Sequence, residues 1–316
     1  MVVKVKVLVR DNEKAEKLKA LYPFVIPIIG SLDDVGVIEA VAGEVGVVVN
    51  AADCDHIGAI SAIIRGLNKH PENAFFIHTS GVASILDSAA GAFMGEKIWD
   101  DVTDIEELTA LPGGTIHYES DKLVRSACST IKVAIVSPPA AYGVSPSPWH
   151  PTWLALPLLL SVARGLSSGF TVSIGANITS YVHVKDLAQL YVRLLSYAVG
   201  SNKDRSQVGD LDVWGPQAYY LAFSEEVSFA ESMASLVPVL KQKGVIQDES
   251  IKQLSAEDVA GLDGSGMLGI AFGTNERVRS TRAKILGWKP QQPDVRSTWA
   301  EVITRYLEEE QRRKIE

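Results

Sequence analysis

The first half of the chain alternates β-branched runs with stretches of helical spacing, and this alternation restricts the fold more than any other feature. Apolar residues at helical spacing, such as Ile57, Ile60 and Ile64, predict helices between the runs, and Asp11 or Asn12 can cap the first of these helices. Strands separated by helices of about 10–15 residues form βαβ units with parallel strands. We therefore expect an α/β fold, with strands near residues 2–9, 24–29, 45–50, 74–78 and 131–136.

The second half has a different pattern. Four prolines fall within residues 143–169, which suggests that this segment leaves the sheet. Residues 185–199 have an apolar face at helical spacing, with Asp186 able to cap the helix. From about residue 227 the pattern is mostly helical. A sheet domain with a smaller, mostly helical C-terminal lobe would leave a cleft between the two parts.

Composition excludes several classes of protein. The 316 residues carry a formal net charge of −8 without a basic run, which argues against a nucleic-acid partner. Two cysteines, Cys54 and Cys128, cannot form a disulfide framework, so a reducing, cytoplasmic location is expected. The longest apolar run, 153–163, is too short to cross a bilayer and is broken by Pro157, so no membrane partner is expected.

The most informative local pattern is the segment Tyr118-Glu-Ser-Asp-Lys122. Residues four apart share a helix face, so the phenol and the ammonium would point the same way. A nearby ammonium favours the phenolate, which makes Tyr118 a candidate general acid for a carbonyl oxygen. Taken alone, the pattern favours a surface lysine beside a half-buried tyrosine over a catalytic pair.

Four further segments follow or join expected strands, where ligands bind in open α/β sheets. Small residues end one strand at Asn50-Ala51-Ala52-Asp53, and hydroxyls end the next at His78-Thr79-Ser80-Gly81. The other two segments are Ser137-Pro-Pro-Ala-Ala-Tyr-Gly143 and Tyr181-Val-His-Val-Lys-Asp-Leu-Ala188. With Tyr118–Lys122 and Leu286-Gly-Trp-Lys-Pro290, their order and spacing resemble the extended short-chain dehydrogenase/reductase family, in its epimerase/reductase branch common in fungi.

The resemblance implies a Rossmann-like, doubly wound parallel sheet and an NAD(P)-dependent hydride transfer involving a small carbonyl or hydroxyl substrate. Residues 1–145, with 171–200 added, would form the dinucleotide-binding domain, and 146–170 with 201–316 the substrate lobe. The implied catalytic set is Ser80, Tyr118 and Lys122, with Thr79 as the alternative hydroxyl. A monomer or homodimer would be expected.

The resemblance also implies a cofactor site. Lys122 would hold the nicotinamide ribose, and Arg10 would meet a 2′-phosphate, which favours NADP over NAD. The remaining positions implied to contact the cofactor are Asp33, Asn50, Ala51, Ala52, Pro138, Ala140 and Ala141. Substrate contacts are expected from Thr79, His78, Tyr142 and Trp149, although Trp149 could equally pack within the lobe.

One departure from the family concerns the first strand. The family opens with a glycine-rich turn whose backbone N–H groups bind the pyrophosphate, but here residues 2–9 run into Arg10-Asp11-Asn12-Glu13. The segment resembles the family's second strand, so the first βα unit is absent. Either the sequence is truncated, by about 20–30 residues, or it is a divergent relative with impaired cofactor binding. The strand at 2–9 should then either close onto 45–50 or border a gap.

Other chemistries have weaker support. The six histidines show no metal-ligand spacing, and Cys54-Asp55-His56 is too short a pattern to indicate a metal site, so no metal is expected. A serine hydrolase is disfavoured because no Gly-x-Ser-x-Gly follows a strand. Two alternatives to a reductase remain: a non-catalytic dinucleotide-binding or regulatory protein, and a sugar-nucleotide epimerase or dehydratase.

Overall fold

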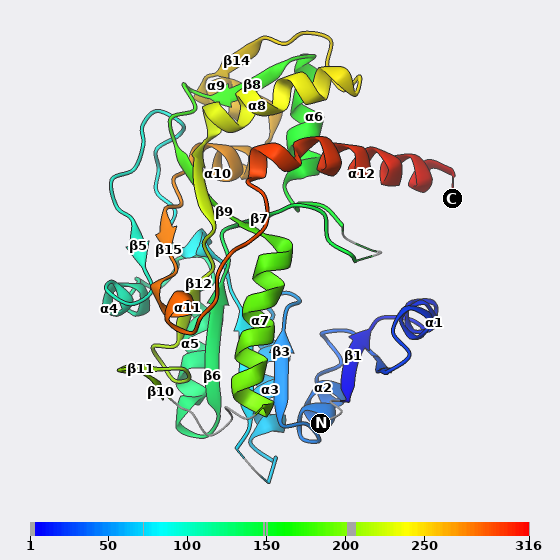
Figure 1. Ribbon diagram of the computed structural model, residues 1–316, viewed down its shortest axis with the longest axis vertical. Helices are drawn as coiled ribbons and strands as arrows, with labels where there is room; N and C mark the ends of the chain where they lie inside the picture. Colours follow the sequence, from blue (N-terminus) through cyan, green and yellow to red (C-terminus); the bar gives the residue numbers. More distant parts are fainter. Residues whose placement is uncertain (1–3, 72, 148, 150, 201–206, 316) are drawn as a thin grey trace. The chain divides into compact units, whose positions relative to one another are not determined.

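The computed structural model describes residues 4–71, 73–147, 149, 151–200 and 207–315 (Figure 1). By their internal contacts, these residues divide into two compact units. Unit 1 comprises Met1–Thr79, His117–Ile135 and Trp214–Ala218. Unit 2 comprises Ser80–Ile116, Val136–Val213 and Tyr219–Glu316. The expected division into a dinucleotide domain and a substrate lobe stays a prediction.

Unit 1 has the alternating strands and helices that the sequence predicts. Its elements are β1 (Val5–Val9), α1 (Asn12–Leu21), β2 (Val25–Ile29), α2 (Val35–Ala42), β3 (Val47–Asn50), α3 (Ile57–Leu67), β4 (Phe75–Thr79), α5 (Tyr118–Ser126), a 3-10 turn (Ala127–Ser129) and most of β6 (Lys132–Ser137). Asp11 caps α1 as expected, because its carboxylate accepts the backbone N–H of Lys14 at 2.8 Å.

The strands of unit 1 are parallel, but they do not form one continuous sheet. β1 pairs with β2 in a sheet of two strands, from Val5↔Val25 to Val9↔Ile29. β3 pairs with β4, from Val47↔Phe75 to Asn50↔His78, and lies at the edge of a four-stranded sheet of order β12-β6-β4-β3. Among the described residues, therefore, β1 does not pair with β3.

The helices α2 and α3 pack closely because of a glycine. A Cβ at Gly66 of α3 would lie 2.4 Å from the carbonyl oxygen of Glu39 and 2.5 Å from the Cβ of Ala42, both in α2. Only a residue without a side chain permits this approach. Glu39 also forms ion pairs with Arg65 of α3 and with Lys69, which follows α3, so charged side chains border the same helix contact. Lys6 of β1 pairs with Glu44, which follows α2.

Unit 2 contains shorter sheets and most of the helices. Its first elements are a 3-10 turn (Val82–Ile85), β5 (Trp99–Asp100), α4 (Ile105–Thr109), β7 (Ala140–Tyr142), α6 (Leu156–Leu166), β8 (Gly169–Val172), β9 (Ile178–His183), α7 (Val184–Val199), β10 (Gln207–Val208), β11 (Leu211–Asp212) and β12 (Tyr219–Leu221). The remainder are β13 (Glu225–Ser228), α8 (Phe229–Gln242), β14 (Ile251–Leu254), α9 (Ala256–Leu262), α10 (Met267–Gly273), β15 (Val278–Arg279), α11 (Thr281–Ile285) and α12 (Val295–Ile315). Its sheets have the orders β13-β9-β7, β14-β8, β15-β5 and β10-β11.

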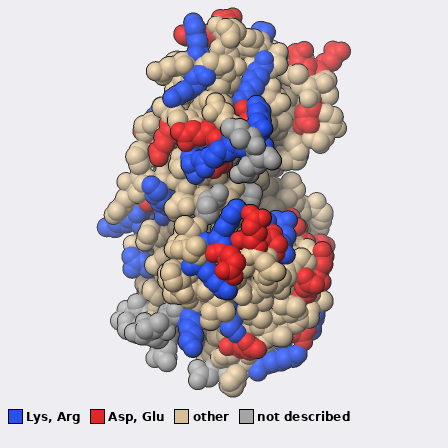
Figure 2. Space-filling model, turned by 90° about the vertical axis from the view of Figure 1, so that its right-hand side faces the viewer, with Lys and Arg blue, Asp and Glu red and all other residues tan. Residues whose placement is uncertain are grey.

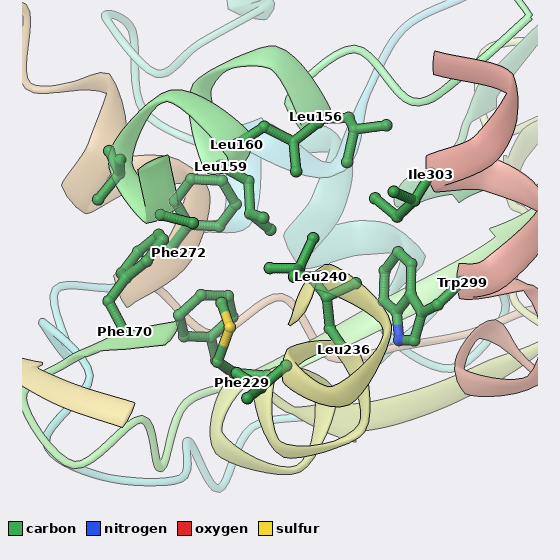
Figure 3. Packing of buried hydrophobic residues seen from close by; sticks show 14 of the residues in the cluster. Leu156, Leu159, Leu160, Phe170, Phe229, Leu236, Leu240, Phe272, Trp299 and Ile303 are labelled. Carbon is green, nitrogen blue, oxygen red and sulfur yellow. The ribbon is translucent and has the colours of Figure 1, made fainter. Parts of the chain in front are cut away.

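The largest hydrophobic cluster lies in unit 2 and joins helices far apart in the sequence. Figure 3 shows the leucines of α6 and α8 directed toward aromatic side chains from β8, α8, α10 and α12. Phe229 and Phe272 stack with ring centroids 5.2 Å apart, and the Nε1–H of Trp299 donates to Ser235 Oγ at 3.1 Å. This cluster explains the helical periodicity of apolar residues in the C-terminal sequence, because each amphipathic helix buries one face in it.

The prediction that Asp186 caps α7 is wrong. His183 is the N-cap, and its Nδ1 accepts the backbone N–H of Lys185 at 3.1 Å. Asp186 instead accepts the backbone N–H groups of Gln291 and Gln292 at 3.0–3.1 Å. Its carbonyl oxygen accepts the indole N–H of Trp288 at 2.8 Å. Asp186 therefore anchors the segment after α11, a contact between residues about a hundred positions apart that local sequence cannot reveal.

The described helices include none that is both long and apolar enough to cross a membrane. On the face drawn in Figure 2, lysine and arginine side chains are interspersed with aspartate and glutamate.

Candidate active site

The Tyr118 and Lys122 side chains lie on one face of α5, as their spacing predicts. The Lys122 Nζ is 5.3 Å from the centroid of the Tyr118 ring, in a cation–π arrangement. The helix begins at Tyr118, and His117 precedes it in the left-handed region with φ 66°. A non-glycine residue rarely adopts this backbone conformation. Tyr118 is half-buried and Lys122 is exposed.

A set of polar side chains surrounds the start of α5 at the carboxyl ends of β3 and β4; we call it the polar cluster. His117 Nδ1 lies 2.8 Å from Asp55 Oδ2 and 3.4 Å from Cys54 Sγ. Ser120 Oγ donates to Asp55 Oδ1 at 2.9 Å. The cluster consists of Asn50, Cys54, Asp55, His78, His117, Ser120 and Asp121.

His78 is the most deeply placed member of the polar cluster. Its side chain is fully buried, and burial lowers the pKa of its imidazole to about 4, so the ring is neutral at pH 7. Its Nδ1 lies 3.3 Å from Asn50 Nδ2, an amide that can only donate. Nδ1 is therefore the acceptor, which places the ring proton on Nε2, 3.9 Å from Asp121 Oδ1. The predicted contact of His78 with substrate stays a prediction.

The ionisation of Cys54 and Asp55 differs although the two residues are adjacent. Burial, reinforced by the charges of Asp55, Asp53 and Asp121, raises the pKa of the Cys54 thiol to about 12. Cys54 is thus a thiol rather than a reactive thiolate. For Asp55, burial acts to raise the pKa, but hydrogen bonds from Ser120 and His117 outweigh it and lower the pKa below 3.8.

Apart from Asn50, the residues expected on the adenosine side lie at the surface of unit 1. Asn50 is buried and its Oδ1 accepts the backbone N–H of Ala52 at 3.2 Å, which fixes the turn after β3 and leaves Ala51 and Ala52 exposed. Asp33 is exposed, and its Oδ1 lies 3.1 Å from His56 Nε2. Arg10 follows β1 and is also exposed. Binding of a dinucleotide by these residues stays a prediction.

Two of the three residues expected beside the nicotinamide, Ala140 and Ala141, line a pocket of unit 2 with a volume of about 350 Å³. Ala140 and Ala141 of β7 form part of its wall, followed by Tyr142 and Gly143. The other lining residues are Pro139, Ser145, Pro151, Thr152, Trp153, Leu154 and Val184. Pro138, which precedes this wall, is half-buried, as is Trp149. The Tyr142 hydroxyl donates to the carbonyl of Pro293 at 2.7 Å, so Tyr142 offers mainly its ring to this pocket.

Ser80 and Thr79 fall at the junction of the two units. Thr79 ends β4 in unit 1, and Ser80 begins unit 2, where its backbone N–H donates to the carbonyl of Val136 at 2.8 Å. The Ser80 side chain is buried. The expected proximity of the Ser80 hydroxyl to Tyr118, which belongs to unit 1, stays a prediction.

Asp55, His117 and Ser120 are among the members of the polar cluster that sequence reasoning missed. Their side chains meet across 62–65 sequence positions, so no local spacing connects them. The available signal was positional, because Asp55 closely follows Asn50–Asp53 at a strand end and His117 directly precedes Tyr118. Both positions border segments that were already expected to form the site.

The phosphate-binding turn of dinucleotide folds has no counterpart at β1. The start of α1, where such a turn would present free backbone N–H groups, is occupied by the Asp11 carboxylate. A carboxylate at this position repels phosphate. The described residues of β1 and α1 therefore do not fit a pyrophosphate.

Comparisons with known proteins support the α/β fold described above. No family model matches the chain. A curated relative, the oxidase ucsJ of Acremonium sp., is 28% identical over 300 residues, which are 90% of this chain and 85% of the relative.

Solved structures with the same fold are more distant in sequence. UDP-glucose 4-epimerase of Thermotoga maritima, determined with UDP-glucose, has a TM-score of 0.60 at 13% identity, covering 96% of this chain and 92% of the other. For dTDP-glucose 4,6-dehydratase of Streptomyces venezuelae, with NAD bound, the TM-score is 0.62 at 16% identity, covering 97% and 89%. The terminal R domain of the myxalamid biosynthetic pathway has a TM-score of 0.64 at 15% identity, covering 97% and 84%.

Proposed function

We propose that this chain, which has the fold of the NAD-dependent epimerase/dehydratase and extended short-chain dehydrogenase/reductase enzymes, is an NAD(P)-dependent oxidoreductase acting on a small carbonyl or hydroxyl substrate. The observation that carries the proposal is the shared face of Tyr118 and Lys122 on α5, beside the carboxyl ends of β3 and β4. In open α/β sheets that edge is where ligands bind. The 28% identical relative named an oxidase favours a redox reaction over epimerisation or dehydration.

In this proposal Tyr118 handles the proton of the reaction. When a carbonyl is reduced, the Tyr118 hydroxyl gives its proton to the oxygen, and in the reverse direction the phenolate takes it back. The Lys122 ammonium stabilises the phenolate that is left, and the Ser80 hydroxyl donates a hydrogen bond to the same oxygen. A bound nicotinamide would supply or accept the hydride. General acid catalysis of this kind contributes about 10²–10⁴-fold to the rate.

A non-catalytic dinucleotide-binding protein is the second candidate. The observation that favours it is the Asp11 carboxylate at the start of α1, since a weakened phosphate site would leave the fold without turnover. In this case NADPH would bind weakly and no substrate would be converted. The first measurement is therefore a titration of the protein against NADPH and NADH, followed by cofactor fluorescence.

The decisive variant is Tyr118→Phe, which removes the hydroxyl and keeps the ring over Lys122. We expect turnover of a carbonyl substrate to fall by about 10²–10⁴-fold while the Kd for NADPH stays nearly unchanged. Tyr22→Phe, a change at an exposed tyrosine at the end of α1, is the matched control. Unchanged turnover in Tyr118→Phe would refute the acid/base role, and turnover absent from the natural sequence despite NADPH binding would favour the second candidate.

A further inference from the structure

Three potential metal ligands converge within the polar cluster. Cys54 and Asp55 lie in the turn after β3, and His117 lies directly before α5. The Sγ, a carboxylate oxygen and the imidazole Nδ1 all lie within 4.8 Å of one another. Among the described residues, this is the group of His, Cys, Asp and Glu side chains close enough to hold a metal ion.

The three side chains converge on one point. Both Cys54 Sγ, at 3.4 Å, and Asp55 Oδ2, at 2.8 Å, approach the same nitrogen of His117. If that nitrogen carries the proton, it donates to the carboxylate, and the Cys54 thiol donates to Asp55 as well. If it is bare, it accepts from the thiol but turns a lone pair toward the carboxylate. A cation satisfies all three groups together, because thiolate, imidazole and carboxylate each present a lone pair to it.

The separations suit a tetrahedral ion. With Zn–S of about 2.3 Å and Zn–N of about 2.0–2.1 Å, the sulfur and nitrogen ligands of a tetrahedral zinc lie about 3.5 Å apart. The observed Sγ–Nδ1 distance of 3.4 Å is close to this value. The Nδ1–Oδ2 distance of 2.8 Å would have to lengthen by about half an ångström. A small rotation of the Asp55 side chain, which is 49% exposed, can provide that change.

The surroundings resemble those of an open metal site. Ser120 Oγ donates to Asp55 Oδ1, the oxygen that does not face His117, and would thereby orient the ligating carboxylate. Three protein ligands leave a fourth position for water or for an oxygen of another ligand. The ligand set of one sulfur, one nitrogen and one oxygen favours Zn²⁺ over Mg²⁺ or Ca²⁺, which prefer oxygen ligands.

We propose that Cys54, Asp55 and His117 form a binding site for one Zn²⁺ ion, with Ser120 as the residue that positions Asp55. On binding, the Cys54 sulfur loses its proton to solvent and forms a bond to the metal, so no oxidant or reductant is needed. The site adjoins Tyr118, but its existence does not depend on the proposed oxidoreductase activity. Tests of the metal therefore need neither NADPH nor a substrate.

The first test uses Co²⁺ as a spectroscopic substitute for Zn²⁺. Titrating the purified metal-free protein with Co²⁺ should produce a thiolate-to-cobalt charge-transfer band in the near ultraviolet, at one ion per chain, and Zn²⁺ should abolish it. Cys54→Ser should remove the band, whereas Cys128→Ser should keep it, because Cys128 lies outside the ligand group. A protein without the band, or a band that persists in Cys54→Ser, would overturn the proposal.

The second test measures the role of Ser120 and does not require ligand removal. Ser120→Ala should weaken Zn²⁺ binding by about 10–100-fold, as measured by competition with a chelator, while the cobalt band keeps its shape. An unchanged affinity would show that Ser120 does not position Asp55 for a metal.

A third measurement uses only the natural sequence, so its outcome does not depend on whether a variant folds. In the natural sequence, Zn²⁺ should slow alkylation of Cys54 by iodoacetamide and leave alkylation of Cys128 unchanged, with both sites followed by mass spectrometry. Equal rates at Cys54 with and without Zn²⁺ would refute the site.

Discussion

At the scale of single residues, the chemistry of unit 1 gathers around the first turn of α5. His117, Tyr118 and Ser120 are neighbours in sequence, and each takes part in a different interaction. Because His117 adopts a left-handed conformation, the chain turns sharply just before the helix, and the imidazole lies against Asp55 while Tyr118 lies beside Lys122. The turn at His117 thus places the imidazole next to Asp55 and the Tyr118 ring next to Lys122.

Arg10 tests the preference for NADP at this scale. If its guanidinium pairs with the 2′-phosphate, Arg10→Ala should weaken NADPH binding by about 10–100-fold and leave NADH binding nearly unchanged, because only NADPH carries that group. The measurement is the Kd of each cofactor by fluorescence titration. Arg65→Ala is the control, since Arg65 pairs with Glu39 between α2 and α3. Equal losses for both cofactors would mean that Arg10 does not recognise the 2′-phosphate.

Glu226 predicts a dependence of stability on acid pH. Its carboxylate pairs with Arg277 at 2.7 Å and Arg279 at 2.9 Å. Burial opposes ionisation, but these arginines outweigh it and lower the pKa of Glu226 from 4.5 to about 2. The folded pKa lies below the unfolded one, so the stabilisation is complete above about pH 4.5 and is lost as pH falls toward 2.

The variant Glu226→Gln checks this prediction. At pH 7 we expect the free energy of unfolding to drop by about 1 kcal/mol, a modest value because the ion pairs are partly screened by solvent. At pH 2.5 the natural protein and the variant should differ much less. Denaturant unfolding at both pH values provides the measurement, and a difference that stays constant with pH would contradict the assignment.

At the scale of elements, the contact between α2 and α3 decides how unit 1 packs. These helices follow β2 and β3, which belong to two different sheets, so their contact links the β1–β2 pair to the four-stranded sheet. The paired charges of Glu39, Arg65 and Lys69 lie along the same contact. Because β1 and β3 do not pair, this helix contact contributes more to the stability of unit 1 than it would in a continuous sheet.

Gly66→Ala should therefore destabilise the protein although alanine favours helices. The added Cβ would lie 2.4 Å from a backbone oxygen of α2, and overpacking of this kind costs about 1–3 kcal/mol. Gly36→Ala in α2 is the matched control, since a Cβ there meets no atom within 4 Å. That change should raise stability by about 0.5–1 kcal/mol. Thermal unfolding of both variants measures the effect, and a stabilised Gly66→Ala would show that the helices are less closely packed.

At the scale of the whole molecule, hydrophobic packing is distributed unevenly between the two units. The largest cluster of buried apolar side chains lies in unit 2, where α6, α8, α10 and α12 meet (Figure 3). Unit 1 exposes several large apolar side chains on its first strands and the turns beside them: Val5, Tyr22, Phe24, Ile26, Ile29 and Val49. We therefore expect unit 2 to supply most of the hydrophobic stabilisation of the described chain.

Leu240→Ala measures the contribution of that core. Leu240 is fully buried in the cluster, so truncating it removes apolar contacts and leaves a cavity, at a cost of about 2–5 kcal/mol. Leu240→Met keeps the volume and should cost less than about 1.5 kcal/mol. The free energy of unfolding in denaturant distinguishes the two. Similar small losses in both variants would show that the cluster around α8 is loosely packed.

The sequence by itself determined the features that depend on neighbouring residues. The period of apolar residues fixed the alternating strands and helices of unit 1, and the four-residue spacing placed Tyr118 and Lys122 on one helix face. Asp11 was one of the two caps expected for the first helix, and its hydrogen bond spans only three positions. In each case the cause of the structure lies within one or two helical turns, where periodicity and local hydrogen bonding are sufficient.

The tertiary structure decided everything that joins distant segments. It alone brings His117 to Asp55 and Cys54, ties Asp186 to residues beyond α11, and leaves β1 unpaired with β3. These contacts depend on how whole elements pack, and packing is set by the sum of many side-chain contacts over the chain rather than by any local pattern. The candidate metal site was therefore invisible in the sequence, although all three of its ligands border segments that the sequence had marked.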